Sequence, residues 1–222
     1  MPEDAATGDP IQPLTRLRPG RHPAGIWVEP VYRELGYPEA LEDVWVRADV
    51  VPLLLHAARS AGRHGHGLLV WDGWRSSELQ RTLFEKYRAQ LQRASGLTAE
   101  PLADLVGRFV TDPDRESSPP GHSTGGAIDV TLCDPHTGAP RDLGGEFDEL
   151  TARSHPGFYD DATDDAGRRC AALRRQLDEA MSQAGFVRFP AEWWHFEYGT
   201  ALWSGVTRRP ILFGRTDLAS EG

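Results

Sequence analysis

The stretch FVRFPAEWWHFEY, residues 186–198, indicates the fold class most directly. Its apolar runs at 186–189 and 193–198 lie on either side of Pro190, and this spacing predicts two strands joined as a hairpin. Helices and short strands along the rest of the chain show no regular strand–helix–strand rhythm. The sequence therefore predicts an α+β fold.

The remaining segments extend this prediction. Apolar spacing and boundary residues predict helices over residues 48–61, 76–91 and 168–184, and strands at 67–71 and 127–132. We expect a small antiparallel sheet flanked by helices, in a single domain over residues 25–222. Residues 1–24 contain five prolines and no sustained periodicity, which predicts an extended N-terminal arm.

The overall composition excludes several classes of protein. The chain has 222 residues, with 24 Lys and Arg against 33 Asp and Glu, and a net charge of −9. This acidic balance argues against binding to nucleic acid, because neutralising phosphates requires a surplus of basic residues. No stretch approaches the roughly 18 apolar residues of a membrane-spanning helix. The first residues lack the basic and apolar regions of a secretory signal, so the expected location is the cytoplasm.

Cysteine is rare in the sequence. Cys133 and Cys170 are the two cysteines, too few for a disulfide framework in a chain of this length. Two buried reduced thiols are the favoured interpretation, and a single bridge is the alternative. The sequence gives no indication of an oligomeric state.

The stretch GHSTGGAID, residues 121–129, carries the first candidate site. His122 and Asp129 are seven residues apart, so in one straight strand they would face opposite sides. The glycines at 125 and 126 allow a turn before the strand, after which the imidazole and the carboxylate can converge. With a second histidine they would form a ligand set suited to Zn²⁺, with a fourth position left for water. From this stretch alone, the alternative is a loop-capping histidine and an ordinary hydrogen-bonded aspartate.

The second candidate site lies within the hairpin. His195 and Glu197 share one face of the predicted strand, and bulky aromatic residues flank the imidazole. Partial desolvation favours the neutral, metal-binding form of histidine. Glu192, next to Pro190, can turn toward this face and transfer protons as a general base. Glu197 is the second candidate for the base, and is favoured as a partner that orients an imidazole.

The third candidate site is WDGWRS, residues 71–76, where the predicted strand 67–71 ends. Charged residues at such an end commonly lie at the rim of a site. Arg75 stays ionised and is suited to stabilising negative charge on a carbonyl under attack. The alternative is a structural salt bridge with one of the many acidic residues.

Together the three stretches resemble the zinc D-alanyl-D-alanine dipeptidases of vancomycin resistance, the VanX type. That family carries Asp-Gly-aromatic-Arg, then Ser-x-His-x-x-Gly-x-Ala-x-Asp, then Glu-x-x-His. The matching residues here are Asp72-Gly73-Trp74-Arg75, then His122, Gly125, Ala127 and Asp129, then Glu192-Trp193-Trp194-His195. The resemblance covers roughly residues 25–200, and three motifs in the same order are far more specific than any one of them.

The resemblance implies a role for each matched residue. His122, Asp129 and His195 would hold one Zn²⁺ ion per chain. Glu192 would be the general base, and Arg75 would stabilise the transition state.

Substrate contacts are implied less directly. Asp148, in a Phe-Asp-Glu segment, resembles the family aspartate that holds the substrate's ammonium group, and Tyr32 resembles a tyrosine of the same pocket. The family serine two residues before the first zinc histidine is Pro120 here, followed by Gly121. Ser123 is then a nearby hydroxyl that can meet the substrate carboxylate.

The expected function is that of a monozinc dipeptidase acting on a small dipeptide with free ends, with D-Ala-D-Ala as the first candidate. In the cytoplasm such activity would deplete the dipeptide before it enters cell-wall precursors, as the family implies. Because Pro120 replaces a serine, a related zinc amidase acting on another small peptide or a natural-product intermediate is an alternative. A non-catalytic zinc-stabilised binding module is a third hypothesis, and the presence of Glu192 and Arg75 argues against it.

Overall fold

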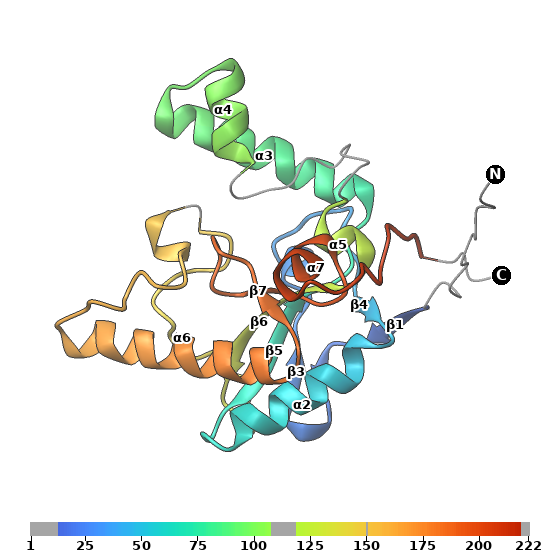
Figure 1. The fold of residues 1–222 in the computed structure, drawn as a ribbon, viewed down its shortest axis with the longest axis vertical. Helices are drawn as coiled ribbons and strands as arrows, with labels where there is room; N and C mark the ends of the chain where they lie inside the picture. Colours follow the sequence, from blue (N-terminus) through green and yellow to red (C-terminus); the bar gives the residue numbers. More distant parts are fainter. Residues whose placement is uncertain (1–12, 108–118, 150, 219–222) are drawn as a thin grey trace.

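A six-stranded sheet lies at the centre of the structure, a computed structural model that describes residues 13–107, 119–149 and 151–218 (Figure 1). The strand order is β2 (Gly20–Arg21), β3 (Ile26–Val28), β5 (Gly67–Asp72), β6 (Ala127–Cys133), β8 (His195–Glu197) and β7 (Val187–Arg188). Neighbouring strands are antiparallel apart from β3 and β5, which are parallel. The predicted α+β class is confirmed, with a parallel pair that the sequence did not indicate.

Shorter strands complete the β structure. The predicted hairpin forms from β7 and β8, which pair antiparallel. A separate two-stranded sheet joins β1 (Leu14–Leu17) to β4 (Val44–Arg47). Residues 14–17 fall within the predicted N-terminal arm, and residues 1–12 of that arm lie outside the described part of the chain. The division of the chain at residue 24 stays a prediction.

The predicted helices form, and side-chain caps fix where α3 and α6 begin. The helices are α1 (Val31–Glu34), α2 (Val50–Gly62), α3 (Ser77–Ser95), α4 (Ala99–Val106), α5 (Gly121–Thr124), α6 (Asp165–Gln183) and α7 (Ala201–Thr207). The Ser76 hydroxyl accepts a hydrogen bond from the Leu79 amide at 3.1 Å, which starts α3. Asp164 caps α6 in the same way through the Gly167 amide at 2.9 Å, so α6 begins three residues before its predicted start. The short helices α1, α4, α5 and α7 were not predicted.

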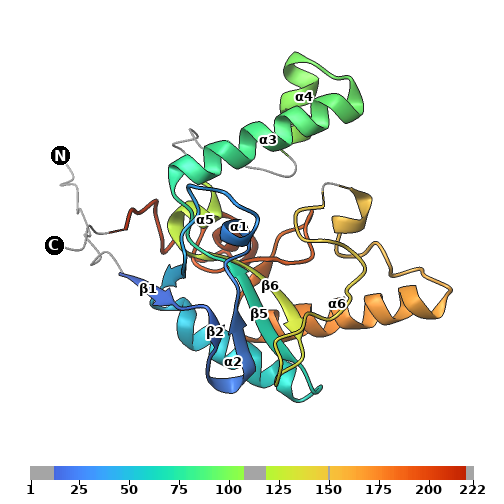
Figure 2. The ribbon, with the colours of Figure 1, turned by 180° about the vertical axis from the view of Figure 1, so that it is seen from behind.

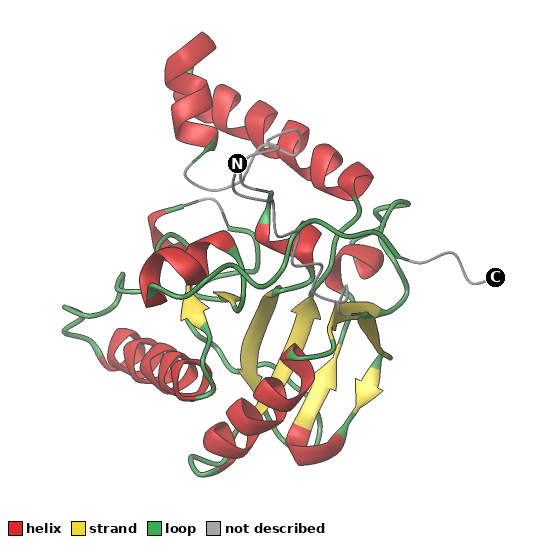
Figure 3. Cartoon of the chain, turned by 45° about the vertical axis from the view of Figure 1, so that its right-hand side comes forward, coloured by secondary structure: helices red, strands yellow, loops and turns green. Residues whose placement is uncertain are grey.

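The core lies on one face of the central sheet. Ile128, Val130 and Leu132 of β6 pack there with the apolar faces of α2 and α6. Figures 2 and 3 show helices lying along one face of the sheet. Because side chains alternate along a strand, Asp129 faces the opposite side of the sheet. The apolar periodicity that builds the core thus places this carboxylate away from it.

A bulge at the end of β5 brings a second carboxylate to Asp129. The β5–β6 register shifts between Val70 and Asp72, so Asp72 pairs with Asp129 and Trp71 is the extra residue. Bulges of this kind re-aim side chains and are common beside functional sites. The shift also directs the chain that follows, including Arg75, toward the Asp129 side.

Helices α3 and α4 form an arm that projects from the rest of the structure (Figure 1). Leu91, Leu102 and Val106 make a small apolar cluster between these two helices. Nearer the sheet, α3 buries Leu83 and Tyr87 in a separate cluster with Tyr32 of α1. The first half of α3 is thereby held against α1.

The two cysteines, Cys133 and Cys170, are both free and buried, as expected. Among the described residues, no helix is long and apolar enough to cross a membrane.

Close packing at the start of β5 leads to a stability prediction. A Cβ atom at Gly67 would lie 3.0 Å from Cys133 Sγ and 3.1 Å from Pro135 Cα, and closer still to the Gly25 carbonyl oxygen. Gly67→Ala should lower the free energy of unfolding by about 1–3 kcal/mol, because backbone atoms must shift to make room. Urea unfolding followed by tryptophan fluorescence measures this change.

Gly62→Ala is the matched control, since a Cβ atom there has nothing within 4 Å. At the end of α2 this change should be neutral or stabilise by up to about 1 kcal/mol. Equal stability of the Gly67→Ala variant and the unmodified chain would contradict the packing described at β5.

Candidate metal and active site

Strand pairing brings together two of the predicted metal ligands. Asp129 of β6 and His195 of β8 are directly opposite partners in the sheet. Asp129 Oδ1 lies 3.0 Å from His195 Nδ1, and both residues are buried. The two residues are 66 positions apart in the sequence, and the pairing of two short strands brings them into contact.

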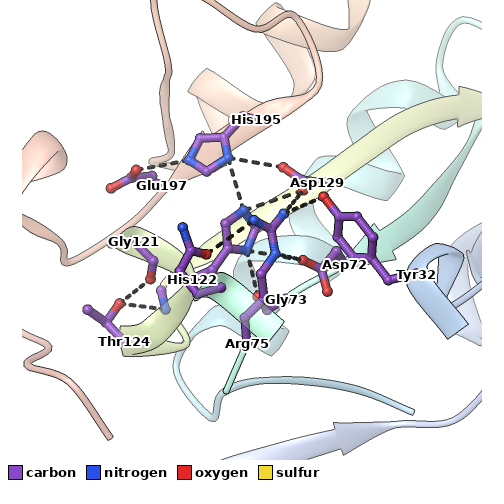
Figure 4. Close-up of polar contacts among 12 residues, drawn as sticks. Tyr32, Asp72, Gly73, Arg75, Gly121, His122, Thr124, Asp129, His195 and Glu197 are labelled. Atoms are coloured by element: carbon purple, nitrogen blue, oxygen red, sulfur yellow. Dashed lines mark hydrogen bonds and ion pairs between the residues drawn. The ribbon is translucent and has the colours of Figure 1, made fainter. Parts of the chain in front are cut away.

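The third predicted ligand, His122, arrives from the short helix α5. This helix ends at Gly125, whose φ of 74° lies in the left-handed region that glycine favours, and the chain then turns into β6. His122 Nε2 lies 3.1 Å from His195 Nδ1 and 3.4 Å from Asp129 Oδ2 (Figure 4). One ligand atom from each of the three residues lies within 4.8 Å of the others.

Hydrogen bonds on the outer side of each ring determine which nitrogen faces this centre. His122 Nδ1 lies 2.6 Å from the Gly73 carbonyl oxygen, and His195 Nε2 lies 2.9 Å from Glu197 Oε1. Both partners are acceptors, so with a cation bound these outer nitrogens would carry the protons and the inner nitrogens would present lone pairs to it. Two imidazole lone pairs and a carboxylate converging on one point form a donor set that fits a cation such as Zn²⁺.

The electrostatics of the centre also favour positive charge. Burial alone would lower the pKa of His195, but its hydrogen bonds to Asp129 and Glu197 raise that pKa to about 10. Asp129, though buried, has its pKa held far below the usual range by His122 and His195. The pocket therefore keeps its aspartate ionised and stabilises a positive charge beside it.

Glu197 anchors the outer side of His195, as the sequence suggested. The Thr200 hydroxyl donates to Glu197 Oε2, while Glu197 Oε1 accepts from the imidazole. A Cβ atom at Gly121 would lie 2.6 Å from Glu197 Oε1, so only glycine leaves room for this carboxylate.

Removing the Glu197 carboxylate should weaken metal binding. In Glu197→Ala, His195 loses the acceptor that fixes its tautomer, and zinc affinity should fall by about 10- to 100-fold. Competition with a chromophoric chelator measures the affinity. Glu146→Ala removes an exposed carboxylate from the same chain and serves as the control. Equal zinc affinities of the two variants would contradict the orienting role.

Glu192 lies in the loop between β7 and β8, beside the candidate metal centre. Glu192 Oε2 is 3.9 Å from His195 Nδ1. Burial raises the pKa of Glu192 to about 8, so its proton affinity is matched to proton exchange near neutral pH. The structure thus brings the predicted base to the predicted ligands.

Arg75 is held by acidic and polar partners on several sides. Its Nη2 donates to Asp129 Oδ2 at 2.9 Å and to the Tyr32 hydroxyl at 3.1 Å, and its Nε pairs with Asp72. Burial would lower its pKa, but Tyr32 and the two aspartates raise the pKa well above the usual value. The guanidinium therefore stays charged and has a fixed orientation.

These groups open onto one cavity of about 460 Å³, including the part open to solvent. The lining residues are Arg75, Gln80, Tyr87, Pro120, Gly121, His122, Asp148, Phe189, Glu192, His195 and Glu197. The candidate base, the candidate metal centre and the guanidinium thus face a space that can take a small molecule.

The three predicted substrate-binding residues lie at different positions relative to the cavity. Asp148 lines the cavity, and the Tyr32 hydroxyl donates to Asp148 Oδ2 at 2.6 Å from behind it. Ser123 is not brought to the cavity: its side chain is buried and its hydroxyl has no hydrogen-bond partner among the described residues. Successive residues of a helix point about 100° apart, so His122 and Ser123 cannot both face the centre.

Sequence reasoning missed three residues that line the cavity, namely Gln80, Tyr87 and Phe189. Gln80 and Tyr87 are seven residues apart on α3, so they lie on one face of the helix. That face also carries Leu83 and reads in sequence as an ordinary buried face. Phe189 stacks edge-on against His195, with ring centroids 5.4 Å apart.

Comparisons with known proteins indicate the family of the chain. The sequence pattern of the M15 peptidase family, described as D-ala-D-ala dipeptidase, matches residues 34–212. A D-alanyl-D-alanine dipeptidase of Synechocystis sp. strain PCC 6803 is 34% identical over 152 residues, which cover 62% of this chain and 61% of the relative. One from Enterococcus faecium is 33% identical over 144 residues, or 64% of this chain and 67% of the relative.

Among solved structures, the vancomycin-resistance D,D-pentapeptidase VanY in complex with Zn(II) is similar at a TM-score of 0.47 and 17% identity. That similarity covers 75% of this chain and 80% of the pentapeptidase chain.

Proposed function

This chain belongs to the M15 peptidase family described as D-ala-D-ala dipeptidase, and on that premise we propose that it hydrolyses D-alanyl-D-alanine with one Zn²⁺ ion per chain. Membership in this family supports a hydrolytic peptidase and argues against the non-catalytic binding module. The observation that carries the proposal is the convergence of His122 Nε2, Asp129 and His195 Nδ1, with both outer ring nitrogens already engaged.

The role proposed for zinc follows from this donor set. Three protein ligands leave a coordination position open, the arrangement typical of catalytic zinc. When bound, the ion supplies Lewis-acid activation of water and of the carbonyl under attack.

Glu192 is the proposed general base and acid. It takes a proton from the attacking water and delivers it to the departing amine, so the same carboxyl serves both halves of the reaction. Its burial and its 3.9 Å separation from His195 support this role.

Arg75 is proposed to stabilise the transition state. Negative charge develops on the carbonyl oxygen as the bond is attacked, and a fixed guanidinium in a poorly solvated site stabilises it strongly. The pairs with Asp72 and Asp129 hold the guanidinium in place before substrate arrives.

Asp148 is proposed to bind the substrate's ammonium group. Its carboxylate lines the same cavity as Glu192, and burial raises its pKa, although the charge of Arg75 and the two tyrosine hydrogen bonds act in the opposite direction. An ammonium group there would restore the charge balance. A dipeptidase needs such a contact, because it must recognise a free amine close to the bond it cleaves.

The proposal is tested with the purified, zinc-loaded chain and a dipeptide panel. D-Ala-D-Ala should be cleaved faster than L-Ala-L-Ala, with released D-alanine measured by a coupled D-amino acid oxidase assay. Chelation should abolish turnover, and added Zn²⁺ should restore it. Failure to cleave D-Ala-D-Ala would reject this substrate.

A second candidate function differs only in substrate. Pro120 lines the cavity where the family resemblance places a serine, and Ser123 does not reach it. A related zinc amidase acting on another small peptide would fit this loss of hydroxyl donors. Cleavage of another dipeptide in the panel without turnover of D-Ala-D-Ala would support it.

We place the reaction in the cytoplasm as part of the same proposal. The family resemblance implies an enzyme that removes the free dipeptide before cell-wall precursors are assembled. The proposed binding partner is the dipeptide, and the proposal involves neither nucleic acid nor a membrane.

A further inference from the structure

Two tyrosines hold the carboxylate of Asp148. Tyr32 of α1 and Tyr87 of α3 both donate their hydroxyl hydrogens to the same oxygen, Asp148 Oδ2. The other oxygen, Oδ1, has no hydrogen-bond partner within the described part of the chain. The carboxylate is therefore fixed in orientation, with one oxygen left to accept from a ligand.

The Asp148 backbone needs such support. Its φ of 58° lies in the left-handed region, which residues other than glycine adopt only when their surroundings hold them there. Both tyrosine donors are uncharged, and no Lys or Arg pairs with Asp148 among the ion pairs of the described residues. The two hydroxyls orient the carboxylate without neutralising it.

The two tyrosines have different positions relative to the cavity. Tyr87 lines the cavity together with Asp148, whereas Tyr32 lies behind the carboxylate and also bonds Arg75. Two helical turns before Tyr87 on α3, Gln80 Oε1 lies 3.4 Å from Arg75 Nη1. The face of α3 that carries Gln80 and Tyr87 thus contacts both Arg75 and Asp148, at the two ends of the proposed substrate site.

We propose that Tyr87 is a positioning residue that gives the site its preference for a free amine. By fixing Asp148 Oδ2 from the cavity side, its hydroxyl turns Oδ1 toward the substrate's ammonium group. This inference rests on the proposed function, because it assigns Asp148 the amine end of the dipeptide. It adds a residue of α3 that neither the motifs nor the family resemblance indicates.

The test compares Tyr87→Phe with Tyr37→Phe. The ring of Tyr37 also contacts Tyr32, with ring centroids 5.6 Å apart, but the Tyr37 hydroxyl accepts a hydrogen bond from Lys86 on the surface. Each variant is assayed with D-Ala-D-Ala for KM and kcat. Zinc content and the unfolding midpoint are measured alongside, to show that both variants are folded and loaded.

Tyr87→Phe should raise KM about tenfold and change kcat by less than about twofold, since the lost hydrogen bond acts on binding of a charged group. Tyr37→Phe should leave both constants unchanged.

A binding measurement isolates the amine preference. Calorimetric titration compares D-Ala-D-Ala with D-lactoyl-D-alanine, in which a hydroxyl replaces the amine. The Glu192→Gln background prevents turnover during the titration. The preference for the amine should fall about tenfold when Tyr87→Phe is added.

The outcomes separate this inference from the proposed function. If the chain cleaves D-Ala-D-Ala and Tyr87→Phe keeps its KM and its amine preference, the role of Tyr87 is overturned and the dipeptidase stands. A fall in kcat with unchanged KM also overturns it. A zinc-loaded chain that neither cleaves D-Ala-D-Ala nor prefers the amine overturns both.

Discussion

Replacing Glu192 by glutamine should lower kcat for D-Ala-D-Ala by about 10³-fold, within the range that general acid–base groups contribute. Glutamine keeps the size of the side chain but cannot take a proton from water or deliver one to the leaving amine. Glu192 lies 3.9 Å from His195 and is not among the three residues that cluster as candidate metal ligands. Zinc content should therefore be unchanged, and steady-state kinetics with metal analysis measure both quantities.

Glu146→Gln, at an exposed carboxylate, is the matched control and should keep full activity. A Glu192→Gln variant that retains more than about a tenth of the kcat would show that another group moves the proton. Glu197 would then be the next candidate, because it also lines the cavity.

Asp129→Ala should cause the second large loss, of both activity and stability. Its carboxylate meets His122, His195 and Arg75, so its removal takes a ligand from the metal centre and a partner from a buried guanidinium. Breaking a buried ion pair costs about 3–5 kcal/mol, and zinc should no longer be retained after dialysis. Urea unfolding and metal analysis measure the two effects.

Thr131→Ala is the control for that change. Thr131 is on the same strand two residues further on, so it shares the face of Asp129. Within the described ranges, its buried hydroxyl has no hydrogen-bond partner. This variant should keep its zinc and its turnover. If Asp129→Ala retained zinc as well as Thr131→Ala does, Asp129 would not be a ligand.

The parts of the fold with clear periodicity were predictable from sequence. The apolar faces of α2, α3 and α6 and the alternation in β6 lie where the sequence placed them. The β1–β4 pair and α7 were missed because segments of four to seven residues give too short a pattern to detect. The parallel pairing of β3 and β5 depends on the path of the chain between them, which local sequence does not specify.

The candidate site was also predictable from sequence only in part. Convergence of His122 with Asp129 was expected from the glycines at 125 and 126, and Gly125 does make the turn. The β-bulge that places Asp72 beside Asp129 depends on strand register, which no motif reports. Tyr87 reaches Asp148 because α3 packs against α1, a tertiary contact that no local pattern reports, so in sequence it looked like one more buried aromatic residue.

The most direct test of the account is anomalous diffraction at the zinc edge from crystals of the zinc-loaded chain. We expect one peak, about 2.0–2.2 Å from His122 Nε2, His195 Nδ1 and an Asp129 carboxylate oxygen, with both outer ring nitrogens still bonded to Gly73 and Glu197. An absent peak, or a peak that these three side chains do not share, would contradict the metal centre and every role assigned around it.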